Sequence, residues 1–330
     1  MKPITLFALV CLTVPQALFA QTPVYTTPTG YTTKDLTVGI NLVGMTVLNS
    51  PVASGQFETI NQTTLVDTQL SYTPVAGRTY VLEFATGSMT GAIFEVSAAN
   101  ITGTTITIST VPATNLTSLG LTTSDRYNLR LAPTLEEIFT TTSLASGGVL
   151  QAGFSSLSAD VVWVPTGPGT YSQYYLNNSG AFTAAGGTTP APNVPVIYAD
   201  GLFVQKKGAT AAKLTLTGEV KTVGTTTAIG QGFNLITVVV AAGATLANAG
   251  FEDDIQGGFS SLSADVVWIQ QANLSYKQYF RNNTNTAWRD AANGTTDLTT
   301  LQAQAVVISG AVLIQRKGAT PISLDLNVPY

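Results

Sequence analysis

Apolar and polar residues alternate at every second position in two separate stretches of the chain. Residues 322–328 read ISLDLNV, and residues 214–217 read LTLT. A period of two places alternate side chains on opposite faces of a β-strand, so that one face is buried and the other meets water. The pattern predicts a half-buried strand at each place.

One stretch favours a helix instead. Residues 132–139 read APTLEEIF, with Thr134 followed three residues later by Glu137, which is the spacing of a capping box. Elsewhere the chain is rich in Thr, Val, Ile, Tyr and Gly, which suit strands and tight turns. We therefore predict an all-β protein in which this stretch is the best candidate for a helix.

Eleven residues occur twice, letter for letter. GFSSLSADVVW spans residues 153–163 and again residues 258–268. Strand alternation through this repeat would place Leu157 and Trp163 on the core side and Asp160 on the other. The expectation extends to the second copy, which holds Leu262, Trp268 and Asp265 at the same positions. Both aspartates are thus expected in solvent, as are the basic pairs at 206–207 and 316–317.

Other segments repeat less strictly and set the extent of each copy. They are GINLVGMTV at 39–47 with GFNLITVVV at 232–240, YSQYYLNN at 171–178 with YKQYFRNN at 276–283, and GLFVQKKGAT at 201–210 with AVLIQRKGAT at 311–320. We predict two homologous β-sandwich-like or barrel-like units in tandem, at residues 33–220 and 221–330.

The first unit is longer because of an insertion at about residues 56–131. This segment has short alternating stretches separated by Thr-Gly, Asn-Ile-Thr-Gly and Ser-Asp turns. Such turns between short strands are typical of a small, strongly bent barrel. We predict a small β-barrel-like subdomain that interrupts the first unit.

The N-terminus resembles a secretory signal. Residues 1–20 contain Lys2, the apolar run ITLFALVCLTV and the small residue Ala20 at the expected cleavage point. Cys11, the single cysteine, lies within this stretch, so the mature chain would form no disulfide, as is more usual for bacterial envelope proteins than for animal extracellular modules. We expect a secreted or cell-surface bacterial protein with no transmembrane segment in the mature chain and an extended N-terminal arm at residues 21–32.

The combination of several segments resembles a known family. YTTPTGY at 25–31, the GINL opening, YVLEFATGSMTGAIFEV at 80–96 and the two KGAT strands are similar to an uncharacterised family of secreted β-rich proteins common in Verrucomicrobia. The resemblance implies an exported β-rich protein, and it implies no established activity or catalytic residue.

The residue types in the chain restrict its chemistry. There is no His, which removes Ser–His and Cys–His triads and most zinc and copper sites. The net charge of −4, without a Lys/Arg cluster, argues against nucleic acid as a partner. We expect no catalytic residue, metal site or cofactor, and leave open whether FEDD at 251–254 binds calcium. A pair of carboxylates, as in glycosidases, is the remaining catalytic option, with these candidates: Asp160, Asp265, Glu136, Glu137, Glu252, Asp253 and Asp254.

Aromatic residues recur at corresponding places in the two units. Exposed aromatic rings can stack on sugar rings or partner surfaces. The candidates for such contact are Tyr174, Tyr175, Tyr279, Phe280 and Trp288. The sequence leaves open whether these rings lie on the surface or in the core.

Charged residues form only 10% of the chain and hydrophobic residues 45%. A monomer with so few charges is poorly equipped to keep apolar surface dispersed. The composition favours a non-catalytic structural protein of the cell surface or extracellular matrix that binds copies of itself in a fibre or layer. The alternatives are a carbohydrate-binding or adhesive module for surface glycans and a carboxylate-dependent glycan-active enzyme.

Overall fold

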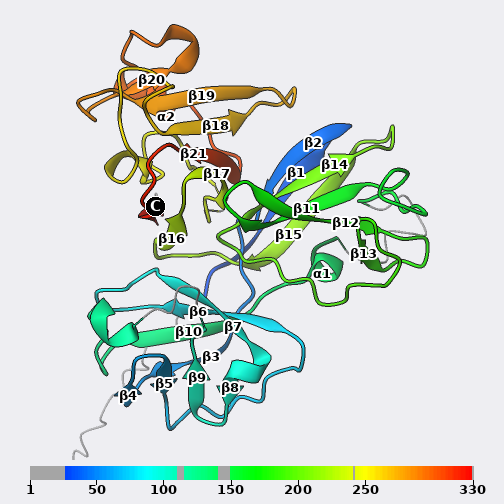
Figure 1. Ribbon diagram of the computed structural model, residues 1–330, viewed down its shortest axis with the longest axis vertical. Coiled ribbons are helices and arrows are strands. Elements are labelled where there is room, and N and C mark those ends of the chain that lie inside the picture. Colours follow the sequence, from blue (N-terminus) through cyan, green and yellow to red (C-terminus); the bar gives the residue numbers. More distant parts are fainter. Residues whose placement is uncertain (1–26, 110–114, 140–148, 241, 329–330) are drawn as a thin grey trace, which may run out of the picture.

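The computed structural model describes residues 27–109, 115–139, 149–240 and 242–328 (Figure 1). The predicted signal peptide and residues 21–26 of the predicted arm lie outside this range. The described residues form antiparallel sheets with two short α-helices, which confirms the all-β class. None of the helices in these ranges is long and apolar enough to cross a membrane.

The first unit combines a five-stranded sheet with a two-stranded ribbon. The sheet has the order β13-β12-β11-β14-β2, and the ribbon pairs β1 with β15. The strands are β1 (Thr29–Leu36), β2 (Gly39–Gly44), β11 (Val161–Gly167), β12 (Thr170–Leu176), β13 (Phe182–Ala184), β14 (Gly201–Lys206) and β15 (Ala212–Glu219). Residues 29–32 were expected in a free arm, but they form the first half of β1, and their backbone pairs within the chain.

The second unit repeats this topology strand for strand. Its sheet has the order β20-β19-β18-β21-β17, and its ribbon pairs β16 with β22. The elements are β16 (Thr225–Ile229), β17 (Gly232–Thr237), β18 (Val266–Gln270), β19 (Tyr276–Arg281), β20 (Trp288–Asp290), α2 (Thr300–Gln304), β21 (Ala311–Arg316) and β22 (Ile322–Leu326), with short 3-10 turns at Phe251–Asp253 and Ala291–Asn293. The repeated sequence therefore encodes a repeated arrangement of strands.

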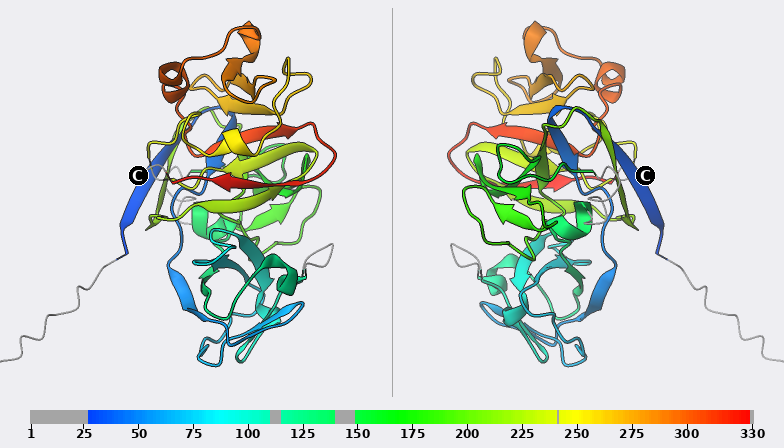
Figure 2. Two further views of the ribbon diagram at one scale, coloured as in Figure 1. Left: turned by 90° about the vertical axis from the view of Figure 1, so that its left-hand side faces the viewer. Right: turned by 90° about the vertical axis from the view of Figure 1, so that its right-hand side faces the viewer.

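A third group of strands lies between β2 and β11. It forms two four-stranded sheets with the orders β3-β10-β6-β7 and β4-β5-β9-β8. The elements are β3 (Pro51–Gln56), β4 (Thr59–Ile60), β5 (Thr64–Val66), β6 (Thr79–Phe84), β7 (Ile93–Ser97), β8 (Ile101–Thr102), β9 (Thr105–Thr107) and β10 (Arg126–Leu131), with 3-10 turns at Ala98–Asn100 and Leu116–Leu119. This insertion has its own core, in which the rings of Phe57 and Tyr127 stack 4.5 Å apart. It lies at one end of the long axis of the molecule, opposite β18–β20 (Figures 1 and 2).

A buried ion-pair network joins the insertion to the first unit. Arg130 Nε lies 3.2 Å from Glu83 Oε2, and Arg130 Nη2 lies 2.8 Å from Glu219 Oε1 on β15. Lys221, in the connection to the second unit, contacts the other oxygen of Glu83. Because Glu83 and Arg130 belong to the insertion, these pairs fix its position against β15 and the connection.

Two local predictions of the sequence are confirmed. α1 (Leu135–Phe139) follows a capping box in which the Glu137 N–H donates to Thr134 Oγ1 and the Thr134 N–H donates to the Glu137 carboxylate. The apolar members of the alternating stretches point into the cores of their units, because Leu214 and Leu324 are buried while Thr215 and Asp325 are exposed. In both cases the interactions involve residues that are close in the sequence, so the sequence alone is enough to predict them.

The two five-stranded sheets pack against each other near β2, β14, β17 and β21. Their contacts are reciprocal. The N–H of Gly169, at the tip of the β11–β12 hairpin, donates to the carbonyl of Phe233 at 2.6 Å. On the other side Gln270, at the end of β18, accepts from the N–H of Leu42 and donates to the carbonyl of Ile40. The units are thus related by an approximate two-fold axis, as in an isologous dimer.

Candidate functional site

The repeated eleven residues do not form one continuous strand. Residues 153–160, the first loop, and 258–265, the second loop, curl into a turn before β11 and β18 begin. In the first loop the N–H groups of Ser158 and Ala159 both donate to the carbonyl of Ser155 at 3.0 Å. The second loop makes the equivalent bonds to Ser260. A period of two therefore does not apply to these residues, and the faces predicted for Leu157, Asp160 and their counterparts are wrong.

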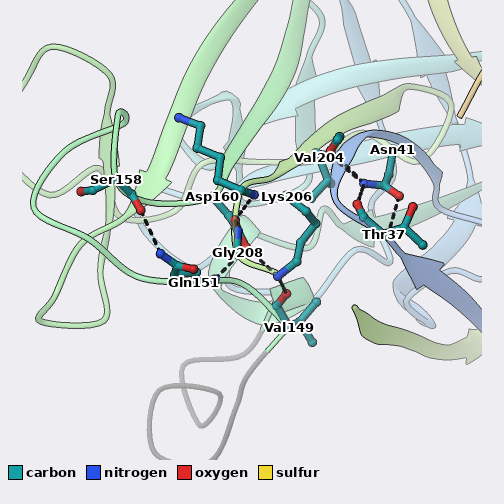
Figure 3. Close-up of polar contacts among 11 residues, drawn as sticks. Thr37, Asn41, Val149, Gln151, Ser158, Asp160, Val204, Lys206 and Gly208 are labelled. Atoms are coloured by element: carbon teal, nitrogen blue, oxygen red, sulfur yellow. Dashed lines mark hydrogen bonds and ion pairs between the residues drawn. The ribbon is translucent and has the colours of Figure 1, made fainter. Parts of the chain in front are cut away.

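Asp160 closes the first loop from inside (Figure 3). Its Oδ2 accepts from Lys206 Nζ and from the N–H of Gln151, both at 2.7 Å, and its Oδ1 accepts from the N–H of Lys207 at 2.6 Å. Lys206 Nζ also donates to the carbonyl of Val149 at 2.8 Å. The side chain of Asp160 is fully buried, so the prediction of a solvent-facing aspartate is wrong. Its hydration is replaced by a cation and backbone donors.

The second loop has the same anchor with a different cation. Asp265 accepts from Arg316 Nη1 at 2.6 Å, from the N–H of Gln256 at 2.8 Å and from the N–H of Lys317 at 2.7 Å. The basic pairs at 206–207 and 316–317 were expected to be solvated, yet Lys206 and Arg316 are buried. Their position is fixed by the two aspartates.

Other identical residues of the repeat also serve the loop itself. A Cβ on Gly153 would lie 2.8 Å from the Ala159 nitrogen, and Gly258 meets the same restriction from Ala264. Ser155 Oγ accepts from the N–H of Leu157, and the carbonyl of Ser156 accepts from the Lys207 ammonium group. The glycine and aspartate positions of the repeat and the serines at 155 and 158 thus have a structural reason, since Ser158 Oγ also donates to the carbonyl of Ser155.

Two large apolar residues of each copy have no such role within the loop. Phe154 and Leu157 are 90% and 88% exposed, and Phe259 and Leu262 are 78% and 86% exposed. They are the four most exposed large hydrophobic side chains of the described residues. The prediction that Leu157 and Leu262 lie in the core is wrong, because the turn at the serines directs them outward. Sequence reasoning did not single out Phe154 and Phe259, although their identity in both copies was a visible signal.

Four of the five predicted contact residues lie inside the units. Tyr175 and Tyr279 are buried, as are Phe280 and Trp288, and the guanidinium of Arg281 lies 5.3 Å from the Trp288 ring centre. Tyr174 is partly buried and packs against the core of the first unit. The interpretation of exposed aromatic platforms is therefore wrong for the four buried residues, whose rings fill space within their own unit.

Trp163 and Trp268 lie outside the main cores of their units, and Trp163 packs against a small buried cluster of Ala159, Val161 and Tyr175. Both tryptophans are partly buried and line one open groove, called the aromatic groove, which is bordered by residues of both five-stranded sheets. Its volume is about 540 Å³. The rings meet edge to face, with 6.2 Å between Trp163 and Phe203 and 5.9 Å between Phe233 and Trp268. The remaining lining residues are Gly39, Ile40, Leu274, Tyr276 and Leu313. The expectation that the tryptophans lie in the main cores is wrong, because Val162 and Val267 point into those cores and the next residue of each strand therefore lies on the opposite face.

Four of the seven candidate carboxylates for catalysis have structural partners, whereas Oε2 of Glu252 is buried without a hydrogen-bond partner among the described residues. Besides the two anchoring aspartates, Glu137 pairs with Arg78 at 2.8 Å, and Asp254 accepts from the N–H of Asp325 at 2.7 Å. Burial raises the pKa values of Glu252 and Asp254. Within the described ranges no three His, Cys, Asp or Glu side chains converge as a metal site would require.

Asp200, which sequence reasoning did not consider, lies where the two units meet. Its carbonyl accepts from Thr237 Oγ1 on β17 at 2.7 Å. Burial, assisted by the negative charge of Glu95, raises the pKa of the Asp200 carboxyl to about 7. This group therefore holds its proton far above the range of an ordinary aspartate.

Comparison of the chain with protein-family models, curated proteins and solved structures finds no match.

Proposed function

We propose that this is an exported, non-catalytic structural protein of the bacterial cell surface or extracellular matrix, and that copies associate through the two loops. The observation that carries this is the identity of Phe154 and Leu157 with Phe259 and Leu262, together with their exposure. Exposed apolar side chains that recur on a rigid support are typical of contact surfaces.

The loops present these side chains in a fixed geometry. A flexible loop would lose conformational freedom on binding, which weakens association. Here the buried Asp160–Lys206 and Asp265–Arg316 pairs and the turn at the serines order the backbone in advance. The cost of ordering is therefore already met in the folded chain.

The magnitudes favour the joint use of both loops. Burial of a Phe or Leu side chain contributes about 1.5–3 kcal/mol, so one loop supplies roughly 3–6 kcal/mol. Association of two proteins costs about 4–15 kcal/mol in lost freedom of motion. A single loop is marginal against this cost, whereas two loops supply roughly 6–12 kcal/mol. Two loops together can therefore offset the cost of association, which gives duplication of the loop a role in assembly.

The carbohydrate-binding alternative has less support. It rested on exposed aromatic rings, and four of the five proposed rings are buried. The glycosidase alternative rested on free carboxylates, and Asp160 and Asp265 are held in buried ion pairs. Neither alternative gives a reason for the identical exposed Phe and Leu of the first and second loops, which we call the Phe–Leu loops.

Electron microscopy of the exported protein at increasing concentration tests the proposal. We expect filaments or lattices that grow with protein concentration and that sediment with the cell surface or matrix after fractionation. The variant in which all four exposed side chains are replaced by Ser should give only dispersed particles. A wild-type protein that stays monomeric at high concentration across pH and calcium conditions would contradict the proposal.

A further inference from the structure

The two loops are one exposed apolar surface of the molecule, and the aromatic groove is another. Packing within the units gives no reason for either. We propose that the aromatic groove of one copy receives a Phe–Leu loop of another copy. This inference rests on the proposed function and names the surface that the loops contact. It adds a binding site between the two units, with a protein loop that presents two apolar side chains as its ligand.

The lining of the groove selects the chemistry of its occupant. No charged side chain is among the lining residues. The indole nitrogens of Trp163 and Trp268 are buried beneath the surface, and the Tyr276 hydroxyl already accepts from Gln270 Nε2 at 3.1 Å. A sugar or an ionic ligand would lose hydration in the groove and gain few hydrogen bonds. An apolar side chain loses nothing of this kind.

The loops match this chemistry. Residues 153–159 carry no charge of their own, the aspartate that follows is neutralised by Lys206 inside the fold, and the Lys207 ammonium group is held by the Ser156 carbonyl. A cavity of roughly 150 Å³ is enough to bind benzene. The groove, at about 540 Å³, has room for the phenyl ring of Phe154 together with the side chain of Leu157. The same holds for the second loop, whose sequence is identical.

The symmetry of the molecule also fits the pairing. The groove has two related halves, one with Trp163 and one with Trp268, and the chain carries two loops. The hairpin tips that reach across the unit interface lie at one end of β11 and β18, and the loops lie at the other end. A loop in the groove of the next copy joins two different surfaces, which leads to rings or open filaments, or to a closed two-fold dimer where two copies exchange loops reciprocally.

Disulfide trapping tests this contact, because Cys11 is the single cysteine of the chain. In a Cys11→Ser background, copies with Leu157→Cys are mixed with copies that carry Ile40→Cys. Ile40 is 40% exposed and lines the groove. Under mild oxidation we expect a cross-linked heterodimer as the main product. Separately, Ile40→Glu should weaken association at least tenfold by placing a charge in the groove.

Val38 supplies the matched control. It is 52% exposed, lies two residues from Ile40 and is not among the lining residues. Val38→Cys should give little cross-link with Leu157→Cys, and Val38→Glu should leave association unchanged. If Leu157→Cys copies cross-link to one another, or to Val38→Cys as readily as to Ile40→Cys, the groove is not the receptor, although assembly through the loops stands. If wild-type copies do not associate at all, the proposed function itself fails.

Discussion

Asp160 Oδ2 lies 2.7 Å from Lys206 Nζ, and both side chains are buried at the base of the first loop. Asp265 and Arg316 take the same places in the second unit, 2.6 Å apart. Each pair joins residues about fifty positions apart in the sequence. Each pair also stabilises the short turn that exposes one Phe and one Leu side chain to solvent.

Removal of one charge from this pair should strongly destabilise the fold. Asp160→Asn leaves the Lys206 ammonium group buried without a counter-charge, which typically costs about 3–5 kcal/mol. We expect a loss of this order in the free energy of unfolding from urea titration, and a similar loss for Asp265→Asn. Lys206→Arg should be tolerated, since Arg316 forms the equivalent ion pair with Asp265 in the second unit.

The exposed pair Asp35–Lys213 is the control for this prediction. Its atoms also lie 2.7 Å apart, but both side chains are about 70% exposed. Exposed ion pairs contribute little to stability. If Asp160→Asn costs no more than Asp35→Asn, the anchor does not hold the loop as described.

The Asn of the Gly-x-Asn-Leu openings should not tolerate replacement by Asp. Asn41 Nδ2 donates to the carbonyls of Thr37, Gly39 and Val204 at 2.8–3.1 Å, and Asn234 makes the equivalent bonds in the second unit. A carboxylate would face these carbonyls with no proton to donate, so we expect Asn41→Asp to cost at least about 3 kcal/mol. Thermal unfolding measures this. Asn61→Asp, at an exposed amide, should change the midpoint little.

Asp200 should make stability depend on pH. Its carboxyl keeps a proton in the folded state up to about pH 7, whereas the unfolded chain loses that proton near its ordinary pKa of 3.8. Between these values unfolding releases a proton, so the free energy of unfolding falls as the pH rises from about 4 to 7. We expect Asp200→Asn to flatten this slope in urea titrations at stepped pH. An unchanged slope would show that Asp200 is not protonated in the folded protein.

The sequence predicts those parts of the structure whose causes are local. The capping box before α1 and the alternation around Leu214 and Leu324 act over a few residues, and the structure has both. The structure of the two loops could not be predicted from such local patterns. The turn at Ser155 interrupts the strand period, and the cation that buries Asp160 lies 46 residues away. The groove depends on contacts between Trp163, Trp268 and two separate sheets, which no single strand pattern contains.

The exposed side chains of the loops should matter for association and not for folding. Phe154→Ser, Leu157→Ser, Phe259→Ser and Leu262→Ser replace side chains that are at least 78% exposed. Such substitutions usually change stability by less than about 0.5 kcal/mol each. Leu301→Ser, on α2, is the matched control, since Leu301 is 77% exposed and belongs to neither loop.

Sedimentation across a concentration series, with the wild type, the four-fold Ser variant and Leu301→Ser compared side by side, tests the central claim most directly. We predict that the average mass of the wild type and of Leu301→Ser rises with concentration, while the four-fold variant remains a monomer with an unchanged unfolding midpoint. Association of the four-fold variant at wild-type strength would contradict the assignment of the loops as the contact surface.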